Sequence, residues 1–239
     1  MNYSSIPLYK CTKALVWCKR FRHRCGYGVH SPFAFNLVTR VIFEKWPYYA
    51  FKELEEVRKN ARRITNLSYL LVHPERVDQL LFRLVNYFSP QTVVELGTQM
   101  GVSSNYLKRA KATTFLSFDW ESALNASQSR FVTSLLSSEE WIQYEKKEQV
   151  TAHLLALKSL DFVYFNTFMP EPDFFEACCQ QSNAKTLFVI QGIYHTPAMQ
   201  EWWKRLVADE RVGITFDLYD VGLLFFDREK KKQHYKVNF

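Results

Sequence analysis

Two glycines and one acidic residue stand at a spacing suited to binding a nucleoside that carries an anionic group. Gly97 and Gly101 are four residues apart, and Asp119 lies 22 residues after Gly97. Glycines in a turn let backbone N–H groups approach an anion closely, and a helix that begins there adds its positive end. A carboxylate about 20 residues further on is placed to bind ribose hydroxyls. These residues predict a site for a nucleoside-like cofactor.

The elements around these residues must form a strand–turn–helix–strand unit for the site to exist. Residues 92–96 are β-branched and apolar, which favours a buried strand, and helical spacing begins at Ser103. A second apolar run, 113–118, ends at Asp119, and the neighbouring Trp120 could stack on a base. The glycine spacing differs from the Gly-x-Gly-x-x-Gly of dinucleotide sites. An ordinary strand–helix–strand unit with glycines at its turn is the alternative interpretation.

The segment Glu95-Leu-Gly-Thr-Gln-Met-Gly-Val-Ser103 resembles the first motif of class I S-adenosylmethionine-dependent methyltransferases. It is most similar to the O-methyltransferase group that includes catechol O-methyltransferase, which favours Glu-x-Gly-Thr-x-x-Gly-x-Ser. From about residue 20 to the end, the chain also resembles a family of bacterial methyltransferase-like proteins typical of Bacteroidetes. That resemblance is carried by Tyr27-Gly-Val-His-Ser-Pro-Phe33, Ile193-Tyr194 and Lys232-Gln-His-Tyr235.

The resemblance implies S-adenosylmethionine as the cofactor and a set of residues that bind it. Gly97, Thr98, Gly101 and Ser103 would hold the methionine part, and Asp119 would bind the ribose hydroxyls.

Three further residues belong to the implied cofactor site. Trp120 would lie beside the adenine, and Asn166 would border the cofactor at the end of the fourth strand. Glu95 would orient the glycine loop or, through water, the cofactor amine. The alternative for Glu95 is a carboxylate paired within the loop.

The acceptor half departs from the pattern of the metal-dependent relatives. These carry Asp at the end of the fourth strand and an Asp-Asp or Asp-Asn pair at the end of the fifth, and the three oxygen ligands hold Mg²⁺. Here the corresponding residues are Asn166, Gln191 and Gly192. Without anionic ligands a hard divalent ion is poorly held, so we expect no metal at this site.

Two histidines are candidates for the base that would deprotonate an acceptor, since histidine titrates near neutral pH. His30 lies in the Gly-Val-His-Ser-Pro segment, and His195 follows the fifth strand. Each has a structural alternative, as a capping residue before Ser31 or as a loop residue packed near Trp202.

The order of apolar runs predicts an α/β fold in which a helical extension, residues 1–90, precedes a cofactor-binding domain, residues 91–239. The last two expected strands are only four residues apart, which is too short for a parallel crossover, so they should form an antiparallel hairpin. Strand–helix alternation closed by such a hairpin is typical of the Rossmann-like sheet of class I methyltransferases. The expected strands are 92–96, 113–118, 141–144, 160–165, 186–190, 212–216 and 221–226.

The positive charge of the chain is concentrated at its N-terminus. Residues 1–43, the basic arm, hold seven Lys and Arg residues and no Asp or Glu, whereas the rest of the chain has equal numbers of both signs. Residues 10–24 could bind an anionic surface, either RNA or a membrane, or could form a solvated helix face. Cys11, Cys18 and Cys25 on the same predicted helix could bind a metal with His23 or pack as small apolar residues.

Composition narrows the class of protein. The chain has 239 residues, without an apolar run near the roughly 20 residues that cross a bilayer and without the apolar core of a signal peptide. Its five cysteines show no disulfide-like spacing, which favours the cytoplasm. Three hypotheses follow: a metal-independent methyltransferase acting on a small acceptor, a cofactor-binding protein without catalysis, and a basic-armed module for RNA or membrane surfaces.

Overall fold

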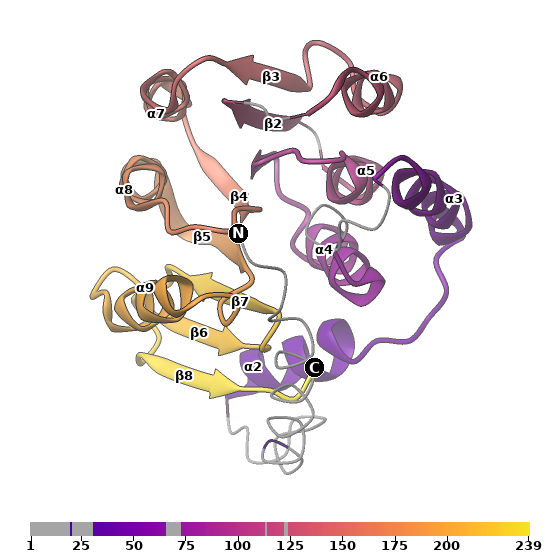
Figure 1. Ribbon diagram of the computed structural model, residues 1–239. Coiled ribbons are helices and arrows are strands. Elements are labelled where there is room, and N and C mark those ends of the chain that lie inside the picture. The colour runs from indigo at the N-terminus through magenta and orange to yellow at the C-terminus, as the bar shows by residue number, and fades with distance from the viewer. Residues whose placement is uncertain (1–19, 21–30, 66–72, 113, 122–123) are drawn as a thin grey trace.

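The computed structural model describes residues 20, 31–65, 73–112, 114–121 and 124–239. These residues form one eight-stranded sheet with helices on both faces (Figure 1). The strands lie in the order β3-β2-β1-β4-β5-β7-β6-β8. Their bounds are β1 Thr92–Leu96, β2 Thr114–Trp120, β3 Trp141–Tyr144, β4 Leu160–Phe165, β5 Ser182–Gln191, β6 Ile214–Asp217, β7 Val221–Phe225 and β8 Gln233–Lys236.

One strand of the sheet runs against the others. β7 pairs antiparallel with both β5 and β6, and the remaining described pairs are parallel. The predicted α/β sheet with an antiparallel C-terminal hairpin is therefore confirmed. The strands β1, β2, β4, β5 and β6 all end at the same side of the sheet, which we call the carboxyl edge.

Helices cover the sheet in two layers. In Figure 1, α3 to α6 lie on one side of the sheet and α7 to α9 on the other. Each face has its own hydrophobic cluster, because parallel strands buried on both sides are apolar on both sides. The helices are α2 Pro32–Leu37, η3 Val38–Ile42, α3 Tyr49–Ile64, α4 Glu75–Phe88, α5 Val102–Arg109, α6 Ala126–Leu135, α7 Lys147–Ala156, α8 Pro172–Gln180 and α9 Pro197–Ala208.

The described part of residues 1–90 is helical and packs on the sheet. Leu80 and Leu84 of α4 belong to the same buried cluster as Val93 of β1 and Val189 of β5. The domain division at residue 90 stays a prediction. The helix predicted to carry Cys11, Cys18 and Cys25 lies outside the described residues apart from Arg20. Within the described ranges, no helix is both long enough and apolar enough to cross a membrane.

Some element boundaries differ from the sequence-based expectation, and one strand was not expected. The sequence also predicts a helix over residues 121–136, and this helix begins at Ala126, because Asn125 and Gln128 form a capping box at its start. β2 continues through Trp120, and β5 already begins at Ser182. The eighth strand, β8, was not predicted and pairs in parallel with β6.

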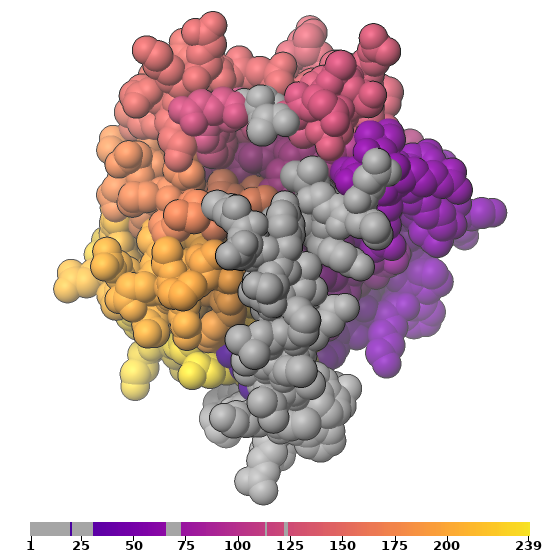
Figure 2. Space-filling model, in the orientation of Figure 1, coloured from indigo at the N-terminus to yellow at the C-terminus, as the bar shows by residue number. Residues whose placement is uncertain are grey.

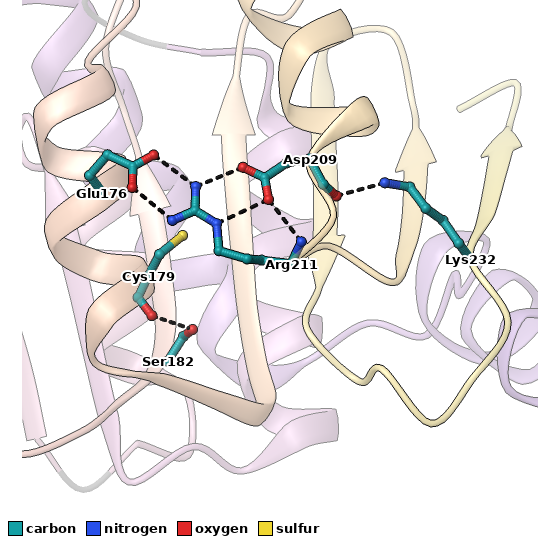
Figure 3. Close-up of polar contacts among 6 residues, drawn as sticks. All are labelled: Glu176, Cys179, Ser182, Asp209, Arg211 and Lys232. Carbon is teal, nitrogen blue, oxygen red and sulfur yellow. Dashed lines mark hydrogen bonds and ion pairs between the residues drawn. The ribbon is translucent and has the colours of Figure 1, made fainter.

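Arg211 and its partners, which we call the arginine clamp, join α8 to the segments that precede β6 and β8 (Figure 3). The Arg211 guanidinium donates to both carboxylate oxygens of Glu176 in α8 at 2.7 Å. It also donates to Asp209, at 2.7 and 3.0 Å, in the turn before β6. The Lys232 ammonium donates to the Asp209 carbonyl oxygen at 2.6 Å, which adds the segment before β8. This clamp lies at the end of the sheet opposite the carboxyl edge.

Candidate functional site at the carboxyl edge

The turn after β1 has the tight backbone geometry for which glycines were expected. Gly97 has φ +96° and Gly101 has φ +68°. A Cβ atom on Gly97 would lie 2.5 Å from the Asn166 carbonyl oxygen, so the approach of β4 requires glycine there. Gly101 is the N-cap of α5, and no side chain caps this helix. The helix therefore presents its positive end next to the carboxyl edge.

Glu95, the next-to-last residue of β1, is fully buried beneath this turn. Its carboxyl group accepts hydrogen bonds from the hydroxyls of Ser104 and Ser117, the latter at 2.8 Å, and from Asn166 Nδ2 at 3.3 Å. Burial raises the pKa of Glu95 to about 8, and the negative charge of Asp78 contributes in the same direction. The side chain is paired within the protein, and the raised pKa favours its protonated form at neutral pH.

Asn166, directly after β4, connects the turn to the N-terminal helices. Its Oδ1 lies 2.5 Å from His73 Nε2 and accepts from Gln99 Nε2 at 3.1 Å. Its backbone oxygen also accepts from Gln99 Nε2, at 2.8 Å. Since its Nδ2 donates to Glu95, every polar atom of the Asn166 side chain is in use. The Oε1 atom of Gln99 is buried, and no partner for it exists among the described residues.

A buried ion pair between α3 and α4 contacts the first turn of α5 and so supports the site. Arg58 of α3 pairs with Asp78 of α4, and both are almost completely buried. Asp78 also accepts from the Ser103 hydroxyl at 2.7 Å, which fixes the first turn of α5. Burial raises the pKa of Asp78 to about 6, although Arg58 acts in the opposite direction. Burial lowers the pKa of His73 to about 4, so this imidazole is neutral.

Asp119 and Trp120 end β2 and point to opposite faces of the sheet, because successive side chains of a strand alternate. Trp120 packs in the α7–α8 layer, edge-on to Phe174 with ring centroids 4.7 Å apart. Asp119 is half-buried and lies on the same face as Ser117, whose hydroxyl is 2.7 Å from that of Thr98. The structure thus brings Asp119, but not Trp120, to the side of the glycine turn.

The end of β5 carries His195 in a tight turn. Gly192 has φ +64°, and a Cβ atom there would lie 2.5 Å from His195 Nδ1. The imidazole stacks on Phe168 with ring centroids 6.5 Å apart, and Phe168 in turn packs 6.4 Å from the His73 ring. Gln191 Oε1 accepts from the Tyr164 hydroxyl at 3.0 Å. His195 is therefore at the carboxyl edge, whereas the other predicted base, His30, lies outside the described residues.

Several site residues were missed by sequence reasoning. His73, Arg58 and Asp78 form the support of the site. Only Asp78 left a signal in the sequence, because it is an acid within the apolar stripe of α4.

Among the residues that the structure describes, no three His, Cys, Asp or Glu side chains are grouped as a metal site. Figure 2 shows the molecular surface hollowed between the pink segments around β3 and α6 and the orange segments around β5.

The fold is similar to that of solved methyltransferases. An O-methyltransferase from Bacillus cereus in complex with SAH is 13% identical, with a TM-score of 0.56 over 80% of this chain and 96% of that chain. The O-methyltransferase TomG from Streptomyces achromogenes, in complex with SAM, is 15% identical, with a TM-score of 0.56 over 87% and 98%. A methyltransferase from Geobacter sulfurreducens is 13% identical, with a TM-score of 0.57 over 77% and 92%.

At these identities the likeness is one of fold. No protein-family model matches the sequence, and no curated protein matches it.

Proposed function

We propose that this chain is a cytoplasmic S-adenosylmethionine-dependent methyltransferase that transfers methyl to a small acceptor, at oxygen and without a divalent metal. One observation carries the proposal. The unit β1–glycine turn–α5–β2–Asp119 stands at the carboxyl edge of a sheet whose one antiparallel strand among those described is β7. Solved proteins of this fold, from Bacillus cereus and Streptomyces achromogenes, were obtained with SAH and SAM.

The residues at the edge fit such a cofactor. The uncapped N-terminus of α5 suits the carboxylate of the methionine part. The buried Oε1 of Gln99, without a partner among the described residues, suits its ammonium group. Asp119 would accept from the ribose hydroxyls. Because the hydroxyls of Thr98 and Ser103 are engaged by Ser117 and Asp78, these two residues would contribute backbone N–H groups.

The same edge does not fit a divalent ion. Asn166 and Gln191 offer only neutral carbonyl oxygens, and both already accept hydrogen bonds from protein groups. Gly192 offers no side chain. A hard ion such as Mg²⁺ would have to exchange tightly held water for these weak donors, which is unfavourable.

When bound, S-adenosylmethionine supplies a methyl group on a sulfonium, which an acceptor oxygen can attack in line while sulfur takes the electron pair of the broken bond. The protein then has to position the acceptor and remove its proton. His195 is the described side chain at this edge suited to take that proton. Its ring is oriented by Phe168 and by the turn at Gly192. His30 remains the second candidate.

Calorimetric titration tests the cofactor assignment. Wild-type protein should bind S-adenosylmethionine and its demethylated product, and Asp119→Ala should weaken binding by about 1–3 kcal/mol through lost hydrogen bonds. Asp161→Ala is the matched control, because Asp161 accepts from Gln91 and Thr92 at the opposite end of the sheet and should leave affinity unchanged. Absence of binding at millimolar cofactor, or tighter binding of NAD, would show that the assignment is wrong.

Methyl transfer to catechols, phenols and carboxylates, with and without chelator, tests the mechanism. We expect turnover that chelator leaves unchanged and that His195→Ala or His30→Ala removes. Activity that chelator abolishes and Mg²⁺ restores would contradict the metal-free mechanism.

The second candidate function is cofactor binding without catalysis. It is favoured by the full use of Asn166 and by the lack of a carboxylate at the ends of β4 and β5. Tight cofactor binding with no turnover on the whole acceptor panel would establish it.

For the basic arm we propose attraction to an anionic surface, RNA or membrane, through residues 10–24. Deleting residues 1–25 should remove salt-sensitive retention on heparin and on anionic vesicles while cofactor binding persists. Unchanged retention would reject both partners.

A further inference from the structure

A second polar centre lies at the carboxyl edge, at the end of β6. Asp217 is fully buried, and each of its carboxylate oxygens accepts two hydrogen bonds. Arg20 donates from Nη1 to Oδ1 and from Nη2 to Oδ2, both at 2.8 Å. The Tyr194 hydroxyl donates to Oδ2 at 2.7 Å, and the Tyr219 backbone N–H donates to Oδ1 at 2.9 Å. The Arg20 guanidinium thus forms a bidentate ion pair with Asp217, and Tyr194 and Tyr219 hold the carboxylate in place.

Two aromatic rings complete the binding of this cation. The rings of Tyr194 and Tyr219 stack with centroids 5.2 Å apart and an interplanar angle of 15°. Arg20 Cζ lies 5.5 Å from the first centroid and 5.7 Å from the second. A carboxylate fork beside aromatic faces matches a guanidinium, which is planar, delocalised and weakly hydrated. Burial alone would lower the pKa of Arg20, but its hydrogen bonds to Asp217 raise the pKa.

Part of this centre is held by groups other than Arg20. Two of the four donors to Asp217 come from Tyr194 and Tyr219, which are fixed by β5 and by the turn from β6 to β7. Tyr219 has φ +71°, a left-handed conformation that is costly for a bulky residue. This strain lies where the Tyr219 N–H donates to the Asp217 carboxylate and the Tyr219 ring lies beside the cation, and such strain is typical of a binding site.

We propose that Asp217, Tyr194 and Tyr219 form a guanidinium-binding site, which the chain fills with its own Arg20 and which a free guanidinium or an arginine side chain enters when Arg20 leaves. The site is separate from the cofactor residues and goes beyond the proposed methyl transfer. Tyr194 belongs to the segment that joins Gln191 to His195, so the site borders the acceptor end of the sheet. Ammonium ions should bind more weakly, because they cannot form the bidentate pair.

Arg20 competes with any added ligand as a tethered group. A tethered ligand acts at an effective concentration in the millimolar range, so wild-type protein should resist occupation of the site by small cations. Methylguanidinium has few atoms and should bind the vacant site with a roughly millimolar dissociation constant.

Titration of Arg20→Ala protein with methylguanidinium chloride, against NaCl at equal ionic strength, tests the proposal. Calorimetry and melting temperature should show saturable binding at roughly millimolar concentration, and wild-type protein should need about tenfold more. The double variant Arg20→Ala/Asp217→Asn is the matched control and should not bind. Methylammonium should bind Arg20→Ala protein at least about tenfold more weakly.

Two results would overturn the proposal. One is that methylguanidinium has no effect on Arg20→Ala protein beyond that of NaCl, and the other is equal binding by the double variant. Should Arg20→Ala fail to fold, Arg20→Lys provides the same test. Its lysine retains the charge without the fork, so methylguanidinium should displace it at lower concentration than it displaces Arg20, and equal concentrations would reject the site.

Discussion

Replacing Glu95 by glutamine tests whether the carboxyl group under the glycine turn is neutral in the folded protein. Glutamine has the same shape and is never ionised. Its amide oxygen can face Asn166 Nδ2, and its amide nitrogen can donate to the hydroxyls of Ser104 and Ser117, which can reverse their role. The substitution therefore keeps the hydrogen bonds and removes only the titration.

The size of the effect follows from the pKa of Glu95, which is raised from an ordinary 4.5 to about 8. Between these values the folded protein holds a proton that the unfolded chain has released, so the free energy of unfolding falls as pH rises. From pH 6.5 to 8.5 the loss is on the order of 2 kcal/mol. Asp78 and His73, whose pKa values are about 6 and about 4, titrate mostly below this window.

Urea unfolding between pH 6.5 and 8.5, followed by circular dichroism, measures this slope. Wild-type protein should lose about 2 kcal/mol across the window, whereas Glu95→Gln should vary by less than about 0.5 kcal/mol. Glu139→Gln, the same change at an exposed position, should follow the wild type. Parallel curves for wild type and Glu95→Gln would refute a neutral Glu95.

Three further substitutions test the support of the site and the clamp, each by urea unfolding. Arg58→Met should lower the free energy of unfolding by about 3–5 kcal/mol because it leaves Asp78 buried without its cation. Adding Asp78→Leu should restore much of this loss, whereas additive losses in the double variant would contradict this account. Gly97→Ala should lower the free energy of unfolding by at least about 2 kcal/mol, because φ is +96° and the new Cβ meets a backbone oxygen. A loss no larger than that of Gly101→Ala would argue against the close approach of β4. Arg211→Gln should cost only about 1 kcal/mol, since the clamp is partly exposed to solvent, and a loss that does not diminish in high salt would show that its contribution is not electrostatic.

The fold could be predicted largely from apolar runs and loop lengths. The strands from β1 to β7 are short apolar segments, and the brief link from β6 to β7 left only an antiparallel pairing. β8 was missed because Gln233–Lys236 is a polar edge strand without a periodic apolar face. The start of α6 was misplaced because the helical spacing continued N-terminal to Asn125, and the capping box there decided the boundary.

The candidate site could be predicted only where function depends on local backbone. Gly97 and Gly101 could be recognised in the sequence because a tight turn with positive φ favours glycine. The partners of Glu95 and Asn166 come from residues up to 93 positions apart, as in the contact of Asn166 with His73. Such pairs depend on how α3, α4 and the sheet pack, which no local pattern encodes.

The lysines around β8 have a consequence for behaviour in concentrated solution. β8 is the outermost strand on its side of the sheet, so one row of its backbone N–H and C=O groups faces outward. A free edge of this kind can template pairing with another molecule and so begin aggregation. The strand has only four residues, of which the exposed Lys236 is the last, and the exposed Lys231 lies two residues before the first. Pairing with β8 of a second molecule would bring the same positive charges together, so like-charge repulsion opposes that pairing and helps to keep the protein dispersed.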